Sequence, residues 1–162
     1  MSATSSDFFE VAPFDGTNYP VWSRRAKAIF SASQLESFLE READLSNQDD
    51  LVKSRKAFAL LISMFSDSVL ASFHEDTACK LWKKLSSVYE AKEAVSQILT
   101  RKRLATAKKS KDVPMRQHID GILNLVTDLR LSGAEVSDMD SIVYILMSLP
   151  REYESVRVSL EN

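Results

Sequence analysis

Apolar residues recur along most of this chain at intervals of three and four positions, which is the spacing of one face of an α-helix. The first stripe comprises Trp22, Ala26, Ile29 and Phe30. The longest regular stripe comprises Ala78, Leu81, Trp82, Leu85, Val88 and Tyr89. Similar segments follow over residues 114–129, 138–149 and 150–160. The pattern predicts an all-α fold of about nine short helices without strands.

Capping residues separate these segments. Ser46 with Asp49, and Ser137 with Asp140, place a hydroxyl and a carboxylate three residues apart, which is the spacing of a capping box. Gly133 follows an apolar stripe, where glycine commonly ends a helix. We therefore expect short connections between well-defined helix ends.

The apolar pattern restarts around residues 91–94, after the stripe that ends at Tyr89. The next predicted helix is led by Val95, Ile98 and Leu99. We expect a flexible N-terminal tail over residues 1–12 and two small helical bundles, over residues 13–91 and 92–162. Bundles of this length lie within the usual size of domains.

Composition supports a folded helical protein and limits its chemistry. The 162 residues are 44% hydrophobic and 27% charged, which is typical of globular proteins. Only three glycines and four prolines are present, whereas β-rich folds need many turns. A net charge of −2 disfavours a protein built mainly to bind nucleic acid, because such proteins usually present a strongly basic face.

The single cysteine, Cys79, excludes an internal disulfide. No apolar run approaches the roughly 18 residues that cross a bilayer. Without a signal-peptide pattern at the start of the chain, these features predict a cytoplasmic protein that does not bind membranes.

Catalytic and metal-binding residue types are scarce. The sequence contains only three histidine or cysteine residues, His74, His118 and Cys79. A structural zinc site usually needs four such ligands. Two pairs of acids, Asp49 with Asp50 and Asp138 with Asp140, lie at the starts of predicted helices, where a negative charge favours the helix dipole. We expect no enzymatic activity, no cofactor and no metal.

Four motifs together resemble the Gag capsid region of copia-type LTR retrotransposons. They are Phe14-Asp15-Gly16-x-Asn18-Tyr19-x-x-Trp22, Leu81-Trp82-x-x-Leu85-x-x-x-Tyr89, Leu129-x-x-x-Gly133 and Ile145-Leu146-x-Ser148-Leu149-Pro150-x-x-Tyr153. Each is weak alone, but their order and separation extend over nearly the whole chain. The resemblance implies N-terminal and C-terminal capsid-like lobes that multimerise into a virus-like shell around RNA.

The resemblance leaves several functions open. The chain has no Cys-x-x-Cys zinc knuckle and no Asp-Thr/Ser-Gly protease motif, so it is either a capsid segment or a host-adopted relative. Self-association into oligomers or shells is the leading hypothesis. The alternatives are a host-adopted adaptor that binds a protein partner and a weak RNA-binding helical module.

Three groups of residues are candidates for binding. Trp22, Trp82 and Tyr89 could stack on bases, but their helical spacing favours a role as core anchors. RNA could bind to a basic run within this chain or to regions outside it. The cations of the basic run are Arg101, Lys102, Arg103, Lys108, Lys109 and Lys111. These cations spread around a helix instead of forming one stripe, which favours a solvated helix end where they offset the dipole over an RNA contact.

The predicted helix over residues 138–149 has an apolar arc of about 200°, wider than one core stripe needs. Its core stripe comprises Ile142, Ile145, Leu146 and Leu149, and Met139, Val143 and Met147 extend it. Tyr144 projects beyond the arc. The excess either packs between helices or forms a protein contact, and joined to the resemblance it makes Val143, Tyr144 and Met147 candidates for self-association.

Overall fold

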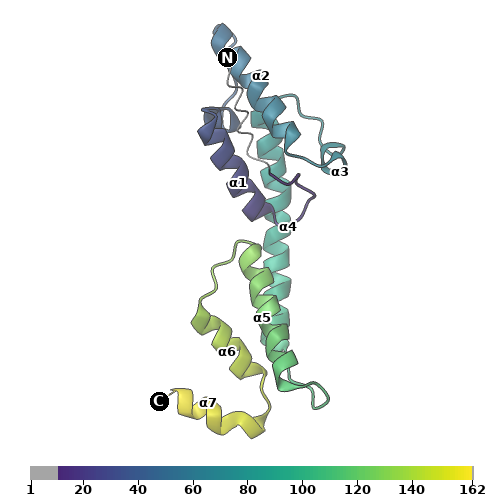
Figure 1. The fold of residues 1–162 in the computed structure, drawn as a ribbon, viewed down its shortest axis with the longest axis vertical. Helices are drawn as coiled ribbons and strands as arrows, with labels where there is room; N and C mark the ends of the chain where they lie inside the picture. Colours follow the sequence, from purple (N-terminus) through teal and green to yellow (C-terminus); the bar gives the residue numbers. More distant parts are fainter. Residues whose placement is uncertain (1–10, 162) are drawn as a thin grey trace, which may run out of the picture. The chain divides into compact units, whose positions relative to one another are not determined.

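A computed structural model describes residues 11–161, which form six α-helices of eight residues or more (Figure 1). These are α1 (Tyr19–Ala32), α2 (Gln48–Ser63), α4 (Ala78–Thr106), α5 (Met115–Leu131), α6 (Asp138–Ser148) and α7 (Glu154–Glu161). Shorter elements are the four-residue α3 (Asp67–Leu70) and two 3-10 helices, η1 (Glu36–Leu39) and η2 (Arg151–Tyr153). Over residues 11–161 there is no strand, so the predicted all-α fold is confirmed.

The predicted number of helices is wrong, because α4 is one helix of 29 residues where two were expected, and two further predicted helices are only the four-residue elements η1 and α3. Residues 90–94 read Glu-Ala-Lys-Glu-Ala, and these residues are among the strongest helix formers. The apolar pattern restarts there because the buried face of the helix changes, while the backbone continues without a break. A change of face therefore resembles a helix end when only periodicity is considered.

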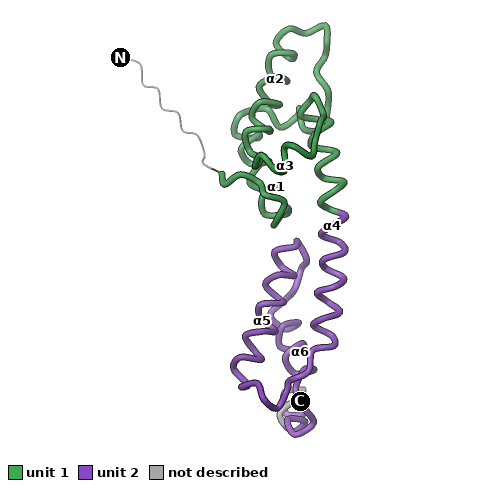
Figure 2. Tube along the Cα trace, turned by 90° about the vertical axis from the view of Figure 1, so that its right-hand side faces the viewer, with its two compact units in different colours: residues 1–90 green, residues 91–162 purple. Residues whose placement is uncertain are grey.

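The chain divides into two compact units, residues 1–90 and residues 91–162 (Figure 2). α4 contributes its first part to unit 1 and the remainder to unit 2. Residues 1–10 of the predicted tail lie outside the described residues, and Val11 packs against the core of unit 1. The interpretation of the units as capsid-like lobes stays a prediction.

Aromatic rings fill the centre of unit 1. Trp22 stacks on Phe14 with ring centroids 4.6 Å apart, and its centroid lies 5.9 Å from that of Trp82. Tyr89 stacks on Tyr19 at 5.6 Å. Trp22, Trp82 and Tyr89 are all at most 7% exposed, which confirms that they are core anchors.

A tight turn brings the N-terminal motif into this core. The Asp15 carboxylate accepts hydrogen bonds from the Thr17 backbone N–H (2.9 Å) and hydroxyl (2.6 Å). Gly16 has a φ of 95°, which side chains rarely adopt, and a Cβ there would lie 3.3 Å from the Tyr89 hydroxyl oxygen. The glycine of the motif is thus required both by the turn and by the packed ring.

Unit 2 has a much smaller buried core. Among the residues whose burial is described, the buried apolar residues of unit 2 are Leu104 of α4 and Ile122, Val126 and Leu129 of α5. Tyr144 and Ile145 of α6 are partly buried against them. The apolar stripe that the sequence predicts over residues 114–129 comprises Met115, Ile119, Ile122, Val126 and Leu129. Burial confirms its last three members.

Helix ends follow the predicted capping residues with one exception. Ser137 and Asp140 form a complete capping box at the start of α6. Gly133, with φ 87°, follows α5, and the next N–H bonds back to the Leu129 carbonyl. α2 is capped by Asn47 and not by Ser46, because the Asn47 side chain accepts from the backbone N–H groups of Asp49 and Asp50.

In residues 11–161, none of the helices combines the length and apolar character needed to cross a membrane.

Candidate assembly surface

One side of α6 is an exposed apolar stripe, called the α6 stripe below. Its members are Met139 (67% exposed), Ile142 (46%), Val143 (44%) and Met147 (47%). They are spaced by three and four residues along the helix and therefore share one face. The opposite face, which carries the buried Ser141 and Ser148, packs against the rest of unit 2.

The N-terminal end of α6 is held by hydrogen bonds and an ion pair. The Asp140 carboxylate accepts from the Ser137 backbone N–H (2.9 Å) and hydroxyl (2.8 Å). These bonds, together with the charge of Arg101, lower the pKa of Asp140, so the carboxylate is ionised at neutral pH. Arg130 of α5 pairs with Asp138 at 3.0 Å.

The C-terminal end of α6 is fixed by the segment that follows α4. The Lys108 ammonium donates to the Met147 carbonyl oxygen at 2.9 Å, and the Lys109 backbone N–H donates to the Ser148 carbonyl oxygen at 2.9 Å. The buried Ser148 hydroxyl bonds the His118 ring at 2.7 Å. With both ends tied, α6 presents its stripe on a fixed helix.

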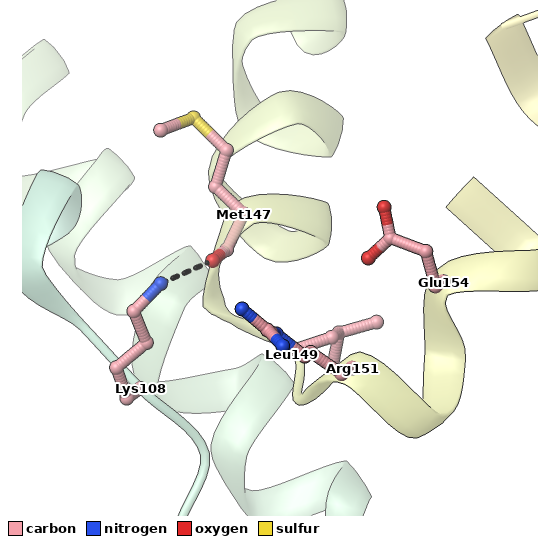
Figure 3. A pocket seen from close by; sticks show the side chains of 5 residues that line it. All are labelled: Lys108, Met147, Leu149, Arg151 and Glu154. Carbon is pink, nitrogen blue, oxygen red and sulfur yellow. Dashed lines mark hydrogen bonds between the residues drawn. The ribbon is translucent and has the colours of Figure 1, made fainter. Parts of the chain in front are cut away.

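An open pocket lies beside this end of α6, lined by Lys108, Met147, Leu149, Arg151 and Glu154 (Figure 3). Figure 3 shows the Lys108 ammonium bonded to the Met147 carbonyl oxygen, with Glu154 on the opposite side of the pocket. The Lys108 charge therefore compensates the negative end of the helix dipole. This gives Lys108 a structural role in the pocket.

The core stripe predicted for α6 is wrong at Ile142, which is 46% exposed. Ile145 is partly buried against the core of unit 2 as expected. The two buried positions of α6 are serines, Ser141 and Ser148. They can be buried because their hydroxyls donate to nearby carbonyl oxygens, Ser141 to that of Ser137 (3.1 Å) and Ser148 to that of Ile145 (2.6 Å). Sequence reasoning missed both serines, since polar residues usually mark an exposed face.

The structure separates the three candidate self-association residues. Val143 and Met147 lie on the α6 stripe with Met139 and Ile142. Tyr144 is half-buried and packs against the core of unit 2. Met139 and Ile142 therefore join Val143 and Met147 as candidates on the exposed face. Tyr144 lies on the side of α6 that faces the core.

A second exposed apolar surface lies on α4, and its members are Val95 (58% exposed), Ile98 (67%) and Leu99 (56%). We call it the α4 patch. The opposite face of α4 carries Gln97 and the buried Leu104, and the Gln97 amide donates to the Ser132 carbonyl oxygen at 2.7 Å. The residues that lead the second half of α4 therefore point away from the core of unit 2.

The six cations of the basic run do not form one surface. Arg101, Lys102 and Arg103 are exposed on the last turns of α4. Lys108 and Lys109 bond the carbonyl oxygens at the end of α6 through an ammonium and a backbone N–H respectively. Lys111 is exposed on the loop before α5.

The catalytic residue types are scattered. Cys79 is buried in unit 1, and His74 is exposed on the loop before α4. The His118 ring forms a hydrogen bond with the Ser148 hydroxyl. Partial burial is the main cause that lowers the pKa of this imidazole, and the positive charge of Lys109 is the second. Among the described residues, no three His, Cys, Asp or Glu side chains are grouped so that they could hold a metal ion.

Comparison with known proteins places the chain near one family. The family described as gag-polypeptide of LTR copia-type matches residues 26–162. The "Retrovirus-related Pol polyprotein from transposon TNT 1-94" of Nicotiana tabacum is 26% identical over 158 residues. That alignment covers 94% of this chain and 12% of the tobacco protein, so the chain spans about an eighth of that relative's length. No solved structure matches the chain.

Proposed function

Because this chain belongs to the gag polypeptides of copia-type LTR retrotransposons, we propose that it is a capsid-like structural protein whose copies associate through the α6 stripe. A gag-type domain is structural and non-catalytic, so the prediction that the chain is not an enzyme is confirmed. Family membership supports the structural role alone. We therefore propose self-association, the enclosure of RNA and a cytoplasmic location in addition to it.

The observation that carries the proposal is the α6 stripe. Its four side chains expose on the order of 400 Å² of apolar surface, which is the size of the largest patches on soluble monomers, and such patches are often functional. None of the four belongs to the buried cluster of unit 2 or to the residues packed against it. Their apolar character is therefore better explained by a contact with another molecule than by folding.

The size of the stripe also indicates how strong each contact is. A stable two-partner interface usually buries about 800 Å² on each side, roughly twice what the α6 stripe offers. A single contact is therefore weak, and many copies must act together to give a stable particle. This behaviour suits a shell that assembles only at high local concentration.

RNA forms a second, weaker part of the proposal. Arg101, Lys102 and Arg103 are exposed on α4 and offer positive charge to phosphates. Three cations give weak, salt-sensitive binding by themselves, but repetition across many associated copies would increase it. Enclosed RNA would then contact many chains through few charges on each.

The α6 stripe is tested by Val143→Asp and Met147→Asp in the full chain, compared by sedimentation velocity at increasing concentration. An interface that desolvates an unpaired charge is strongly destabilised, so association should weaken at least about tenfold, the equivalent of 1.4 kcal/mol. Far-UV circular dichroism should stay unchanged because both positions are exposed.

Leu123→Asp is the matched control for these variants. Leu123 lies on α5, is 41% exposed and is outside the α6 stripe, so the same charge there should leave association unchanged. Equal association of Val143→Asp, Met147→Asp and the unmodified chain would reject the surface. Equal weakening by Leu123→Asp would mean that added charge, and not its position, causes the effect.

A further inference from the structure

The α4 patch and the α6 stripe are similar in size and both belong to unit 2. Val95, Ile98 and Leu99 together expose roughly 300 Å², comparable with the surface of the α6 stripe. Both surfaces lie opposite the face that their helix packs against the core. Unit 2 therefore carries two separate apolar faces.

The helices that carry these faces differ in charge. Residues 91–103 of α4 contain Lys92, Arg101, Lys102 and Arg103 with Glu93 as the only acid, a sum of +3. α6 contains two aspartates and no lysine or arginine, a sum of −2, although within the same copy Arg130 of α5 pairs with Asp138 and the charge of Arg101 acts on Asp140. Pairing α6 with α6 would oppose −2 with −2, and pairing α4 with α4 would oppose +3 with +3. Only the mixed pair is complementary in charge.

We infer that the α6 stripe of one copy docks on the α4 patch of a second copy, with the two helices antiparallel. In this orientation the acidic start of α6 meets the basic end of α4, and Asp140 faces Lys102. The helix dipoles are then opposed, which is the favourable arrangement for neighbouring helices. The inference rests on the proposed self-association and names the surface that receives the α6 stripe.

The spacing along the two helices supports this register. When Asp140 faces Lys102 in an antiparallel pair, Val143 faces Leu99 and Met147 faces Val95. At a rise of 1.5 Å per residue, the α6 stripe from Met139 to Met147 is about 12 Å long. The segment of α4 from Val95 to Lys102 has nearly the same length. Two apolar pairs thus meet along the contact, Val143 with Leu99 and Met147 with Val95.

A contact between two different faces has a consequence that a symmetric contact lacks. In a pair joined in this way, one copy keeps a free α4 patch and the other a free α6 stripe, so further copies can add. Depending on the rotation between copies, the series closes into a ring or continues. A symmetric α6–α6 contact would end at the dimer unless another surface took part.

The test mixes two variants of the full chain, Ile98→Asp on the α4 patch and Met147→Asp on the α6 stripe. Each variant alone should lose self-association at least about tenfold. An equimolar mixture should form a one-to-one complex, because the intact stripe of one variant meets the intact patch of the other. That complex should not grow further. Leu123→Asp should associate like the unmodified chain.

Other results would overturn the inference and leave the proposed function standing. Normal self-association of Ile98→Asp, with Met147→Asp monomeric, would show that α6 pairs with α6. Two monomeric variants whose mixture stays monomeric would also reject the mixed contact. If the unmodified chain stays monomeric at every concentration, both the inference and the proposed function fail.

A charge variant keeps the test decisive if Ile98→Asp disturbs the fold, which circular dichroism would reveal. Lys102→Glu leaves the α4 patch unchanged but should weaken association severalfold, and more at low salt than at high salt. Arg116→Glu, an exposed cation on α5, is its matched control and should have no effect. Unchanged association of Lys102→Glu would reject the docking orientation.

Discussion

Replacing Trp22 in the core of unit 1 tests how much of the fold depends on its aromatic cluster. Trp22 is 5% exposed, and its ring centroid lies 4.6 Å from Phe14, 5.4 Å from Phe65 and 5.9 Å from Trp82. Large-to-small replacements of this kind cost about 3–5 kcal/mol, and each lost ring pair adds about 0.5–1.5 kcal/mol. We expect Trp22→Ala to lie at or above the upper end of that range.

Such a loss is a large part of the 5–15 kcal/mol that typically stabilises a domain. With a urea slope of about 1 kcal/mol per molar, a loss of about 5 kcal/mol moves an unfolding midpoint by about 5 M. Urea titration followed by far-UV circular dichroism measures this shift for unit 1. A midpoint that moves by less than about 1 M would refute the packing argument.

Trp22→Phe separates packing from hydrogen bonding. Within the described residues, the buried indole N–H of Trp22 has no hydrogen-bond partner, and a buried unsatisfied donor costs about 1–3 kcal/mol. Phenylalanine keeps most of the ring contacts and removes that donor, so the two effects oppose each other. The same titration should show a loss within about 1 kcal/mol of zero. A loss as large as that of Trp22→Ala would contradict the argument that the two effects offset each other.

Two further predictions address the turn and the basic run. Gly16→Ala should destabilise unit 1 by about 1–3 kcal/mol in the same titration, because φ is 95° and the added Cβ meets the Tyr89 hydroxyl; an unchanged midpoint would contradict the strained turn. Single-stranded RNA bound through Arg101, Lys102 and Arg103 should lose about tenfold in affinity between 50 and 200 mM salt, measured by fluorescence anisotropy. Salt-independent binding would exclude phosphate contacts.

Unit 1 was the easier half of the chain to predict from sequence. The stripe from Ala78 to Tyr89 and the aromatic motif around Trp22 describe a helix face and a core that belong to the same unit. Bulky apolar residues at helical spacing have few places to go other than a core. The positions that matter for packing were therefore also the ones with the clearest pattern.

Unit 2 was harder because its apolar residues exceed its core. Val95, Ile98 and Ile142 have the spacing of buried residues but are 46–67% exposed, and nothing in a single sequence distinguishes a core stripe from a contact stripe. The buried positions Ser141 and Ser148 went unnoticed because a serine hydroxyl can bond a carbonyl of its own helix and so needs no polar surroundings. Periodicity shows which residues share a face of each helix, but it does not show which face is buried in the core and which is exposed.

The difference between the units bears on how the chain is stabilised. Among the described residues, the buried apolar cluster of unit 1 has 18 members and that of unit 2 has four. Unit 2 exposes more apolar residues on the α4 patch and the α6 stripe than it buries in that cluster. A contact that binds only the folded unit stabilises it by mass action, so association through these faces supplies unit 2 with the apolar burial that its own core lacks. Under the proposed function, unit 1 folds by its own packing, whereas the stability of unit 2 rises with the concentration of the chain.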